Sequence, residues 1–182
     1  MGKKLLGALL ILGIIFIFAG FFVQSKPQII DQGLSPTPLV LNQEIAKVTR
    51  VVDGDTIKVL INNKEESVRL IGIDAPETVD PRKPVQCFGI EATEKAKEIL
   101  DNQTVMLESD STQDNRDKYG RLLRYVFLNA INFNKLMISQ GFAHEYTYMG
   151  NPYRYQLEFK NAERDAGENK KGLWADGVCN KM

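Results

Sequence analysis

Apolar and polar residues alternate in short stretches through the middle of the chain. In the stretch that begins at Thr56, residues Ile57, Val59 and Ile61 fall on one face, which is the period of a half-buried β-strand. The pair Asn62-Asn63 directly after it is typical of a hairpin turn. Similar runs predict five strands in total, at residues 45–52, 56–61, 67–73, 104–108 and 122–128.

Three further stretches have apolar residues at helical spacing. The first has four of them on one face: Ala92, Ala96, Ile99 and Leu100. A short second helix, beginning near Phe133, is expected to stop at Gly141. The pair Asn151-Pro152 suits a helix cap and first turn, so it predicts a third helix that ends at Gly167.

The predicted order is therefore three strands, one helix, two strands and two helices. Short hairpin strands with one inserted helix indicate a five-stranded Greek-key β-barrel with three α-helices, an α+β architecture. A β-meander with helices is the alternative that the pattern leaves open.

The first residues differ in character from everything that follows. Residues 5–23 form an uncharged apolar run of 19 residues, preceded by Lys3 and Lys4. This run is long enough to cross a bilayer as a helix, and it is longer than the apolar part of a usual secretory signal. The two lysines are expected to stay cytoplasmic.

We therefore expect residues 1–23 to be a transmembrane anchor, 24–43 an extracytoplasmic linker rich in proline, and 44–182 the folded domain. The protein would be a single-pass protein of the cell membrane with its domain outside. Cleavage after Ser25 is the alternative, and it would make the protein a secreted one.

The charge of the chain restricts how it could bind nucleic acid. The formal net charge is zero, and residues 44–182 carry 20 basic and 22 acidic residues. A protein that holds nucleic acid through a broad electrostatic surface would be strongly basic. Any chemistry on phosphate must then come from a small local cluster, assisted by a cation.

The chain has two cysteines, Cys87 and Cys179. In an extracytoplasmic domain an even pair favours a disulfide, although two unpaired thiols remain the alternative. Together with the single histidine, His144, they supply too few ligands for a metal site of the cysteine and histidine type.

Two acidic clusters are candidates for chemistry. The run Asp53-Gly54-Asp55-Thr56 places two carboxylates around a glycine before a strand, but taken alone it also fits a plain hairpin turn. The run from Arg69 to Glu77 places a guanidinium inside an apolar strand, where it needs an anion. Asp74, the carbonyl of Ala75 and Glu77 together suit a hard, oxygen-liganded cation such as Ca²⁺. A structural ion pair of Arg69 with Asp74 or Glu77 is the alternative.

Two further groups are weaker signals. The run Asp117-Lys118-Tyr119-Gly120-Arg121 is a polar turn that leads into the fifth strand, and alone it reads as a solvated turn. Tyr146 and Tyr148 could stack on bases or bind a phosphate. Ordinary packing explains the nearby Tyr153 and Tyr155 at least as well.

Taken together, these runs resemble the thermonuclease (staphylococcal-nuclease-like) family. The three runs 52–56, 69–77 and 117–121 occur in the order and approximate spacing of that family, and Gln140-Gly141-Phe142-Ala143 also resembles its segment after the second helix. The resemblance covers about residues 44–176. It implies an oligonucleotide-binding (OB) barrel with three helices, and Ca²⁺-dependent hydrolysis of DNA and RNA that leaves 3′-phosphate products.

The resemblance also implies a role for individual residues. Asp55 and Asp74 would bind calcium through their carboxylates and Ala75 through its carbonyl, with Asp53 and Thr56 supporting them. Arg69 and Arg121 would hold the scissile phosphate, and Glu77 would act as base for the attacking water or would position it. The nucleotide pocket would contain four residues: Lys118, Tyr119, Tyr146 and Tyr148. Single-stranded or unpaired substrates and a monomeric protein are expected.

Two departures from the family pattern affect these assignments. Ala75 stands where the best-known member has threonine, so a carbonyl ligand is retained and a hydroxyl contact is lost. The stretch from Ala143 to Tyr146 is one residue shorter, which weakens the tyrosine assignments. The competing functions are a membrane-tethered OB module that binds nucleic acid without cleaving it, and a tethered scaffold that binds peptides.

Overall fold

A computed structural model gives the fold of residues 43–82 and 84–179. The predicted membrane segment, and the predicted linker apart from Gln43, lie outside these described residues. Among the described residues, no helix combines the length and the apolar character needed to cross a membrane.

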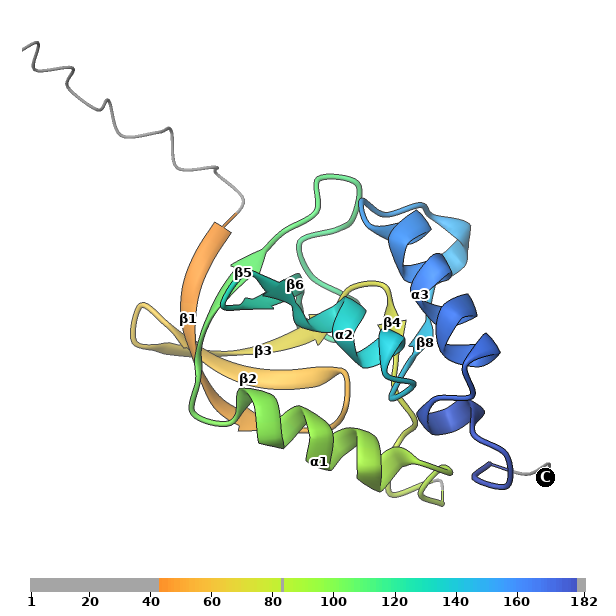
Figure 1. The fold of residues 1–182 in the computed structure, drawn as a ribbon. Helices are drawn as coiled ribbons and strands as arrows, with labels where there is room; N and C mark the ends of the chain where they lie inside the picture. Colours follow the sequence, from red (N-terminus) through yellow and green to blue (C-terminus); the bar gives the residue numbers. More distant parts are fainter. Residues whose placement is uncertain (1–42, 83, 180–182) are drawn as a thin grey trace, which may run out of the picture. The chain divides into compact units, whose positions relative to one another are not determined.

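Five strands close into a β-barrel (Figure 1). β1 (Gln43–Val51), β2 (Thr56–Ile61) and β3 (Lys64–Leu70) form an antiparallel meander, and β5 (Thr104–Glu108) and β6 (Leu122–Leu128) continue from the other edge of β1. A parallel pairing between β3 and β6 then closes the barrel. The predicted five-stranded OB barrel is therefore confirmed.

β1 belongs to both halves of the barrel. Residues 43–47 pair with β5, and residues 47–51 pair with β2, with a shift in register between Val48 and Arg50. Such a bulge bends a strand and increases its twist. The bend lets one strand pass from one half of the barrel to the other.

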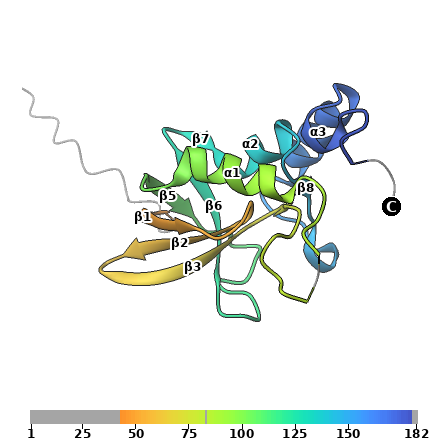
Figure 2. The same ribbon diagram turned by 90° about the horizontal axis from the view of Figure 1, so that it is seen from below.

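Three helices complete the domain, as predicted: α1 (Gly89–Leu100), α2 (Phe133–Ser139) and α3 (Gln156–Glu168). α1 lies along one end of the barrel, and α3 lies on the side away from the β2–β3 hairpin (Figures 1 and 2). The remaining elements are short: β4 (Ile73–Asp74), β7 (Ile131–Asn132), β8 (His144–Glu145) and the 3₁₀ turns Tyr148–Gly150 and Gly172–Trp174.

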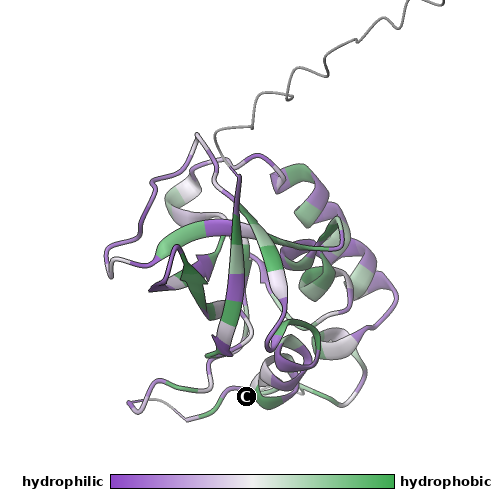
Figure 3. Ribbon diagram, turned by 90° about the vertical axis from the view of Figure 1, so that its left-hand side faces the viewer, coloured by the Kyte–Doolittle hydropathy of each residue, from purple (hydrophilic) through white to green (hydrophobic). Residues whose placement is uncertain are grey.

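The core follows the predicted periodicities. Hydrophilic and hydrophobic residues alternate along the strands (Figure 3), and Ile57 and Val59 of β2 are buried as expected. On α1 Ala92, Ala96 and Leu100 are buried, and Ile99 of the predicted face is only partly buried. The small alanine side chains let this helix lie close to the barrel.

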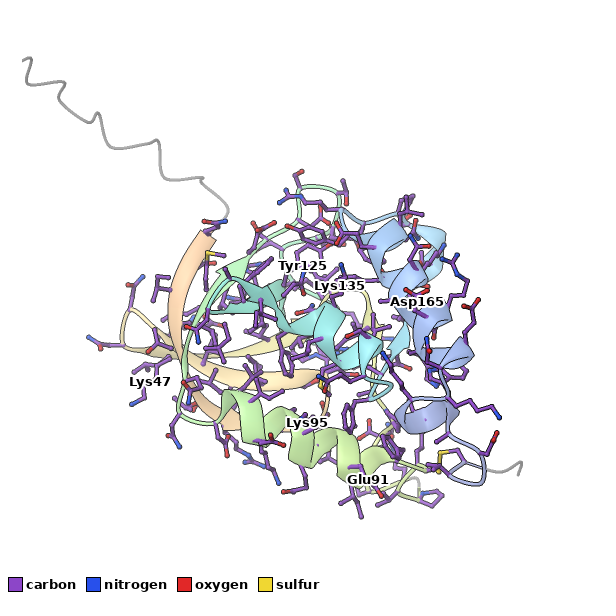
Figure 4. All side chains as sticks on the ribbon, viewed as in Figure 1. Lys47, Glu91, Lys95, Tyr125, Lys135 and Asp165 are labelled. Atoms are coloured by element: carbon purple, nitrogen blue, oxygen red, sulfur yellow. A yellow bond between two sulfur atoms is a disulfide. The ribbon has the colours of Figure 1, made fainter. Side chains whose placement is uncertain are left out.

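An aromatic cluster fastens α3 to β6. The buried Tyr125, labelled in Figure 4, makes edge contacts with Tyr155 at 4.7 Å and Phe159 at 6.2 Å between ring centroids. Its hydroxyl donates to Asp110 at 2.7 Å. Tyr153 is buried and Tyr155 is partly buried against the core, which agrees with the ordinary packing given as the alternative to a role in the site.

One strand differs from its prediction. The run 67–73 was predicted to be a single strand, but β3 ends at Leu70 and β4 begins at Ile73. The backbone between them turns through a left-handed conformation at Gly72, with φ of 77°, which a continuous strand cannot contain. The turn leads the chain away from β2 and into a pairing with β8.

The start of the third helix was also predicted wrongly. α3 begins at Gln156 rather than at Asn151-Pro152, and it ends at Glu168, just beyond Gly167. The carbonyl of Pro152 accepts hydrogen bonds from Thr112 and Gln113. Because these tertiary bonds hold this segment in an extended form, the local cap signal is overridden.

Asn134 joins α2 to the barrel through a buried side chain. Its amide oxygen accepts from the backbone N–H of Val126 at 3.0 Å, and its amide nitrogen donates to the carbonyl of Ile71 at 2.9 Å. These two backbone groups belong to β6 and to the turn between β3 and β4. The side chain therefore fixes the turn that leads to Asp74.

We expect Asn134→Ala to lower the free energy of unfolding by about 2–3 kcal/mol, because two buried backbone groups lose their partner. Asn169→Ala is the matched control, since its amide makes one exposed hydrogen bond, to the carbonyl of Asp165. Urea unfolding of both variants measures the difference. Equal losses in the two variants would contradict the role given to Asn134.

Candidate active site

Arg69 on β3 lies between two carboxylates from different parts of the chain. Its Nη2 donates to Oδ1 of Asp74 at 2.9 Å. Its Nη1 lies 2.5 Å from Oδ2 of Asp55, an ion-pair contact without hydrogen-bond geometry. The expectation that a guanidinium in an apolar strand needs an anion is confirmed, because Arg69 has two carboxylate partners. The ion pair of Arg69 with Asp74, which was given as the structural alternative, is also present.

Asp55 is buried, and each of its two carboxylate oxygens accepts a hydrogen bond. Its Oδ2 accepts from the backbone N–H of Ala75 at 2.9 Å, and its Oδ1 accepts from the hydroxyl of Thr56 at 3.0 Å. Asp53 accepts from the backbone N–H of Asp55 at 3.0 Å and so shapes the turn. Burial raises the pKa of Asp55 to about 6, although the guanidinium of Arg69 acts in the opposite direction.

Gly54 is needed in this turn because neighbouring segments pack directly against it, and not because of an unusual dihedral angle. A Cβ atom built on Gly54 would lie 2.6 Å from Cβ of Ala75 and 3.2 Å from Cβ of Ala92. The turn between β1 and β2 can therefore touch both the segment after β4 and helix α1. This contact places Asp53 and Asp55 beside Ala75.

The donor set fits a hard cation. Asp55 and Asp74 supply carboxylate oxygens, and burial raises the pKa of both carboxyl groups, so a nearby positive charge would favour their ionised forms. Within residues 43–82 and 84–179 no three acidic, histidine or cysteine side chains gather as a metal-binding group. A cation here would therefore take further oxygen ligands from a carbonyl such as that of Ala75, from water and from substrate.

Arg121, at the entrance to β6, is held by Asp117. The carboxylate of Asp117 lies 2.7 Å from Nε and 2.6 Å from Nη2 of Arg121, and it also accepts from the backbone N–H of Arg121 and of Tyr119. Burial acts to raise the pKa of Asp117, but the hydrogen bonds from Arg121 outweigh it and the net pKa lies below its ordinary value. The guanidinium also lies 5.3 Å from the ring centre of Tyr119 and 3.4 Å from the hydroxyl of Thr56.

A cleft of about 780 Å³ brings together most of the predicted site residues. They come from β3, from β4, from the loop before β6 and from the segment after β8: Arg69, Asp74, Lys118, Tyr119, Arg121, Tyr146 and Tyr148. The rings of Tyr146 and Tyr148 lie 6.3 Å apart and are half exposed. Asp53, Asp55, Thr56 and Ala75 lie behind this surface and are buried.

Glu77 is a predicted catalytic residue that does not contact the other predicted site residues through these hydrogen bonds and ion pairs. Its Oε1 accepts from the backbone N–H of Val79 at 2.7 Å and of Asp80 at 3.1 Å, within its own loop. It is not among the described residues that line the cleft. Its place in the chain, three residues after Asp74, keeps it next to the site.

Cys87 and Cys179 are joined by a disulfide, with their Cα atoms 5.8 Å apart. The bond connects the start of α1 to the tail of the domain, and it is the yellow sulfur–sulfur bond near Glu91 in Figure 4.

The sequence reasoning gave no role to Asp117, although it lies in a run that was singled out. Its spacing of four residues before Arg121, across a turn closed by Gly120, was the available signal. No local pattern marked Asn134 or Asp110, because their partners are distant in the chain.

Comparisons with known proteins agree on one family. The sequence profile described as "Staphylococcal nuclease homologue" matches residues 67–176, which include Arg69, Asp74 and Arg121. A thermonuclease of Staphylococcus hyicus is 37% identical over 176 residues, covering 97% of this chain and 100% of that protein.

Two other relatives show similar likeness. A thermonuclease of Staphylococcus intermedius is 41% identical over 70% of this chain and 74% of its own length. Endonuclease YncB of Bacillus subtilis is 38% identical over 76% of this chain and 67% of its own length.

The raised pKa of Asp55 gives a pH-dependent stability in the cation-free protein. Because the folded-state pKa of about 6 lies above the ordinary value of 3.8, this carboxyl contributes stability that is complete at low pH and lost as the pH rises through 6. The loss is on the order of 3 kcal/mol. We expect Asp55→Asn to remove it, so that the variant gains stability relative to the wild type between pH 4 and pH 7.

Urea unfolding at several pH values in the presence of a chelator measures this difference. Asp165→Asn is the control, since its exposed carboxylate on α3 has only a 3.8 Å contact with Arg164. If the two variants follow the same pH dependence, the buried charge of Asp55 does not have the proposed cost.

Proposed function

This chain belongs to the staphylococcal nuclease homologue family and is a nuclease, a hydrolase that acts on nucleic acid, and we propose that it cleaves both DNA and RNA with Ca²⁺ as its cofactor. The observation that carries this proposal is the convergence of Arg69 and Arg121, which are far apart in sequence, on one cleft that also contains Asp74. A binding module would not require two guanidinium groups beside a cation-binding carboxylate.

The two arginines act on the phosphate. Each guanidinium can donate two parallel hydrogen bonds to non-bridging oxygens, and these bonds strengthen as negative charge builds up during attack by water. Asp117 keeps Arg121 pointed toward the cleft, and Asp55 and Asp74 keep Arg69 there. A bound Ca²⁺ would neutralise the same charge as a Lewis acid.

Glu77 is the residue that we assign to the attacking water. As a carboxylate it can accept the proton of that water, or it can orient the water in line with the leaving group. Rupture of the bond between phosphorus and the 5′ oxygen leaves a 3′-phosphate product. To reach the water, Glu77 must release at least part of its contact with the N–H groups of Val79 and Asp80.

The nucleotide itself would be held by the tyrosines around the cleft. Tyr146 and Tyr148 present half-exposed rings, and Tyr119 lies within 5.1 Å of the ammonium group of Lys118. Aromatic rings bind unpaired bases by stacking, which favours single-stranded substrates. We propose that one protein molecule carries a complete site and acts as a monomer.

Digestion of single-stranded DNA by the full-length protein tests this function. We expect cleavage with Ca²⁺, loss of cleavage when the ion is chelated, recovery when it is added back, and products that carry a 3′-phosphate. Arg121→Ala and Glu77→Gln should each lower turnover at least about 100-fold, because a transition-state donor or a base is lost.

Arg164→Ala is the control for these variants, because Arg164 is exposed on α3 and makes only long contacts of 3.8–3.9 Å. Circular dichroism should show that all variants are folded. Binding of DNA without cleavage by the wild type would reject the proposed activity, and near-normal turnover of either site variant would reject that residue's role.

We also propose that residues 1–23 anchor the protein in the cell membrane, with the domain on the outer side. The 19-residue apolar run after two lysines supports this location. Fractionation of cells that express the full chain should recover it with membranes, with Met1 retained and the domain sensitive to external protease. A soluble product that begins after Ser25 would show that the segment is cleaved.

A further inference from the structure

The segment that carries Glu77 is held by Gln86, which lies nine residues later. The backbone N–H of Glu77 donates to Oε1 of Gln86 at 2.8 Å, and the backbone N–H of Gln86 donates to the carbonyl of Glu77 at 2.9 Å. Two hydrogen bonds in opposite directions fix the position of the Glu77 backbone. Gln86 does not line the cleft among the described residues.

The start of α1 presses on the same segment. A Cβ atom on Gly89 would lie 2.7 Å from Cγ2 of Thr78 and 3.0 Å from the carbonyl oxygen of Pro76, so a larger residue there would push the segment away. One turn further along α1, the hydroxyls of Thr78 and Thr93 lie 3.3 Å apart. The residues on both sides of Glu77 therefore rest on α1.

The start of α1 is in turn attached to other parts of the domain. Cys87 forms the disulfide with Cys179, and the ring of Phe88 stacks on Phe142 with centroids 5.4 Å apart and an angle of 27°. Gln86 is the direct neighbour of Cys87. The covalent bond thus limits the movement of the side chain that holds Glu77.

We propose that Gln86 is a positioning residue for the reaction, which sets the place of Glu77 relative to the attacked phosphate, and that the Cys87–Cys179 disulfide fixes Gln86 for this purpose. This inference rests on the proposed function of Glu77. Gln86 touches neither substrate nor cation. Its effect should therefore appear in the catalytic step and leave substrate binding unchanged.

The first experiment uses the full-length protein with Ca²⁺ and single-stranded DNA. Gln86→Ala should lower kcat about 10-fold with KM unchanged, because a small displacement of a reacting group is costly. Gln86→Glu keeps an acceptor oxygen at the same distance and should restore most of the rate. Gln103→Ala is the matched control, since Gln103 is an exposed glutamine in the turn before β5, away from the cleft, and it should keep the wild-type kcat.

A double-variant cycle separates positioning of Glu77 from general damage to the structure. If Gln86 acts through Glu77, Gln86→Ala adds no further loss to Glu77→Gln. If the two losses multiply, or if Gln86→Ala alone has the wild-type kcat, the inference is overturned. If the wild type cleaves DNA and Glu77→Gln does not, either of these two results removes only the role of Gln86 and leaves the proposed function intact. If Glu77→Gln has the wild-type rate, the role of Glu77 is rejected, and the inference about Gln86 is rejected with it.

The disulfide is tested by Cys87→Ser together with Cys179→Ser. This double variant should also lower kcat, by about 3- to 10-fold, without a change in KM, and the loss should not multiply with that of Gln86→Ala. A wild-type kcat in the folded double variant would overturn the part of the inference that concerns the disulfide. Should this variant fail to fold, the wild type and Gln86→Ala are each compared before and after treatment with a dithiol, which reduces the Cys87–Cys179 bond to two thiols and is itself oxidised to a disulfide. Reduction should lower kcat of the wild type and leave that of Gln86→Ala unchanged, and an unchanged wild-type kcat would overturn the role of the disulfide.

Discussion

The pairing of one guanidinium with two carboxylates determines the arrangement of this site. Arg69 extends from a barrel strand with a side chain that is only 15% exposed, and Asp55 is more deeply buried. A charge withdrawn from water is costly unless it is paired, and removal of one partner leaves the other uncompensated. The turn between β1 and β2, strand β3 and strand β4 must therefore meet at one point. A rearrangement that separated them while they stayed buried would leave a charge without a partner.

Buried polar side chains behind the cleft also hold distant segments of the chain together. Asn134 links the turn after β3 to β6, and Asp110 accepts from Tyr125 and from the backbone of Arg154. These bonds fix the two loops that border the cleft to the barrel and to α3. Without these hydrogen bonds, buried backbone and hydroxyl groups would have no partner, which would lower the stability of the fold. The stability of the domain and the shape of the cleft therefore depend on the same side chains.

The elements with strict local patterns were predictable and the others were not. β2, β5 and β6 have the predicted bounds, because alternation of apolar residues is a property of the strand itself. The break at Gly72 was missed since an apolar run with one glycine reads as a continuous strand. The delayed start of α3 was missed because the competing hydrogen bonds to Pro152 come from residues about forty positions earlier.

In the site, too, some features could be predicted from the sequence and others could not. Chemistry alone indicated that Arg69 needs an anion, and the structure supplies Asp55 and Asp74. The pairing of Asp117 with Arg121 had a local signal in their spacing of four residues, which was overlooked. The contact of Gly54 with Ala75 depends on three-dimensional placement and could not be derived from spacing. The assignment of Arg121 to the phosphate and of Glu77 to the attacking water came only from resemblance to a family.

The weak overall charge of the domain gives these local contacts their importance. Residues 44–182 have slightly more acidic than basic residues, so little affinity for a polyanion can come from the surface as a whole. Four cationic side chains line the cleft in which we propose that the scissile phosphate binds: Arg69, Arg116, Lys118 and Arg121. The three arginines among them are already ion-paired to protein carboxylates. A phosphate in its ground state must compete with those carboxylates, whereas the more highly charged transition state competes better. Partial neutralisation of the arginines therefore favours binding of the transition state over binding of the substrate, which is the condition for catalysis rather than mere retention of nucleic acid.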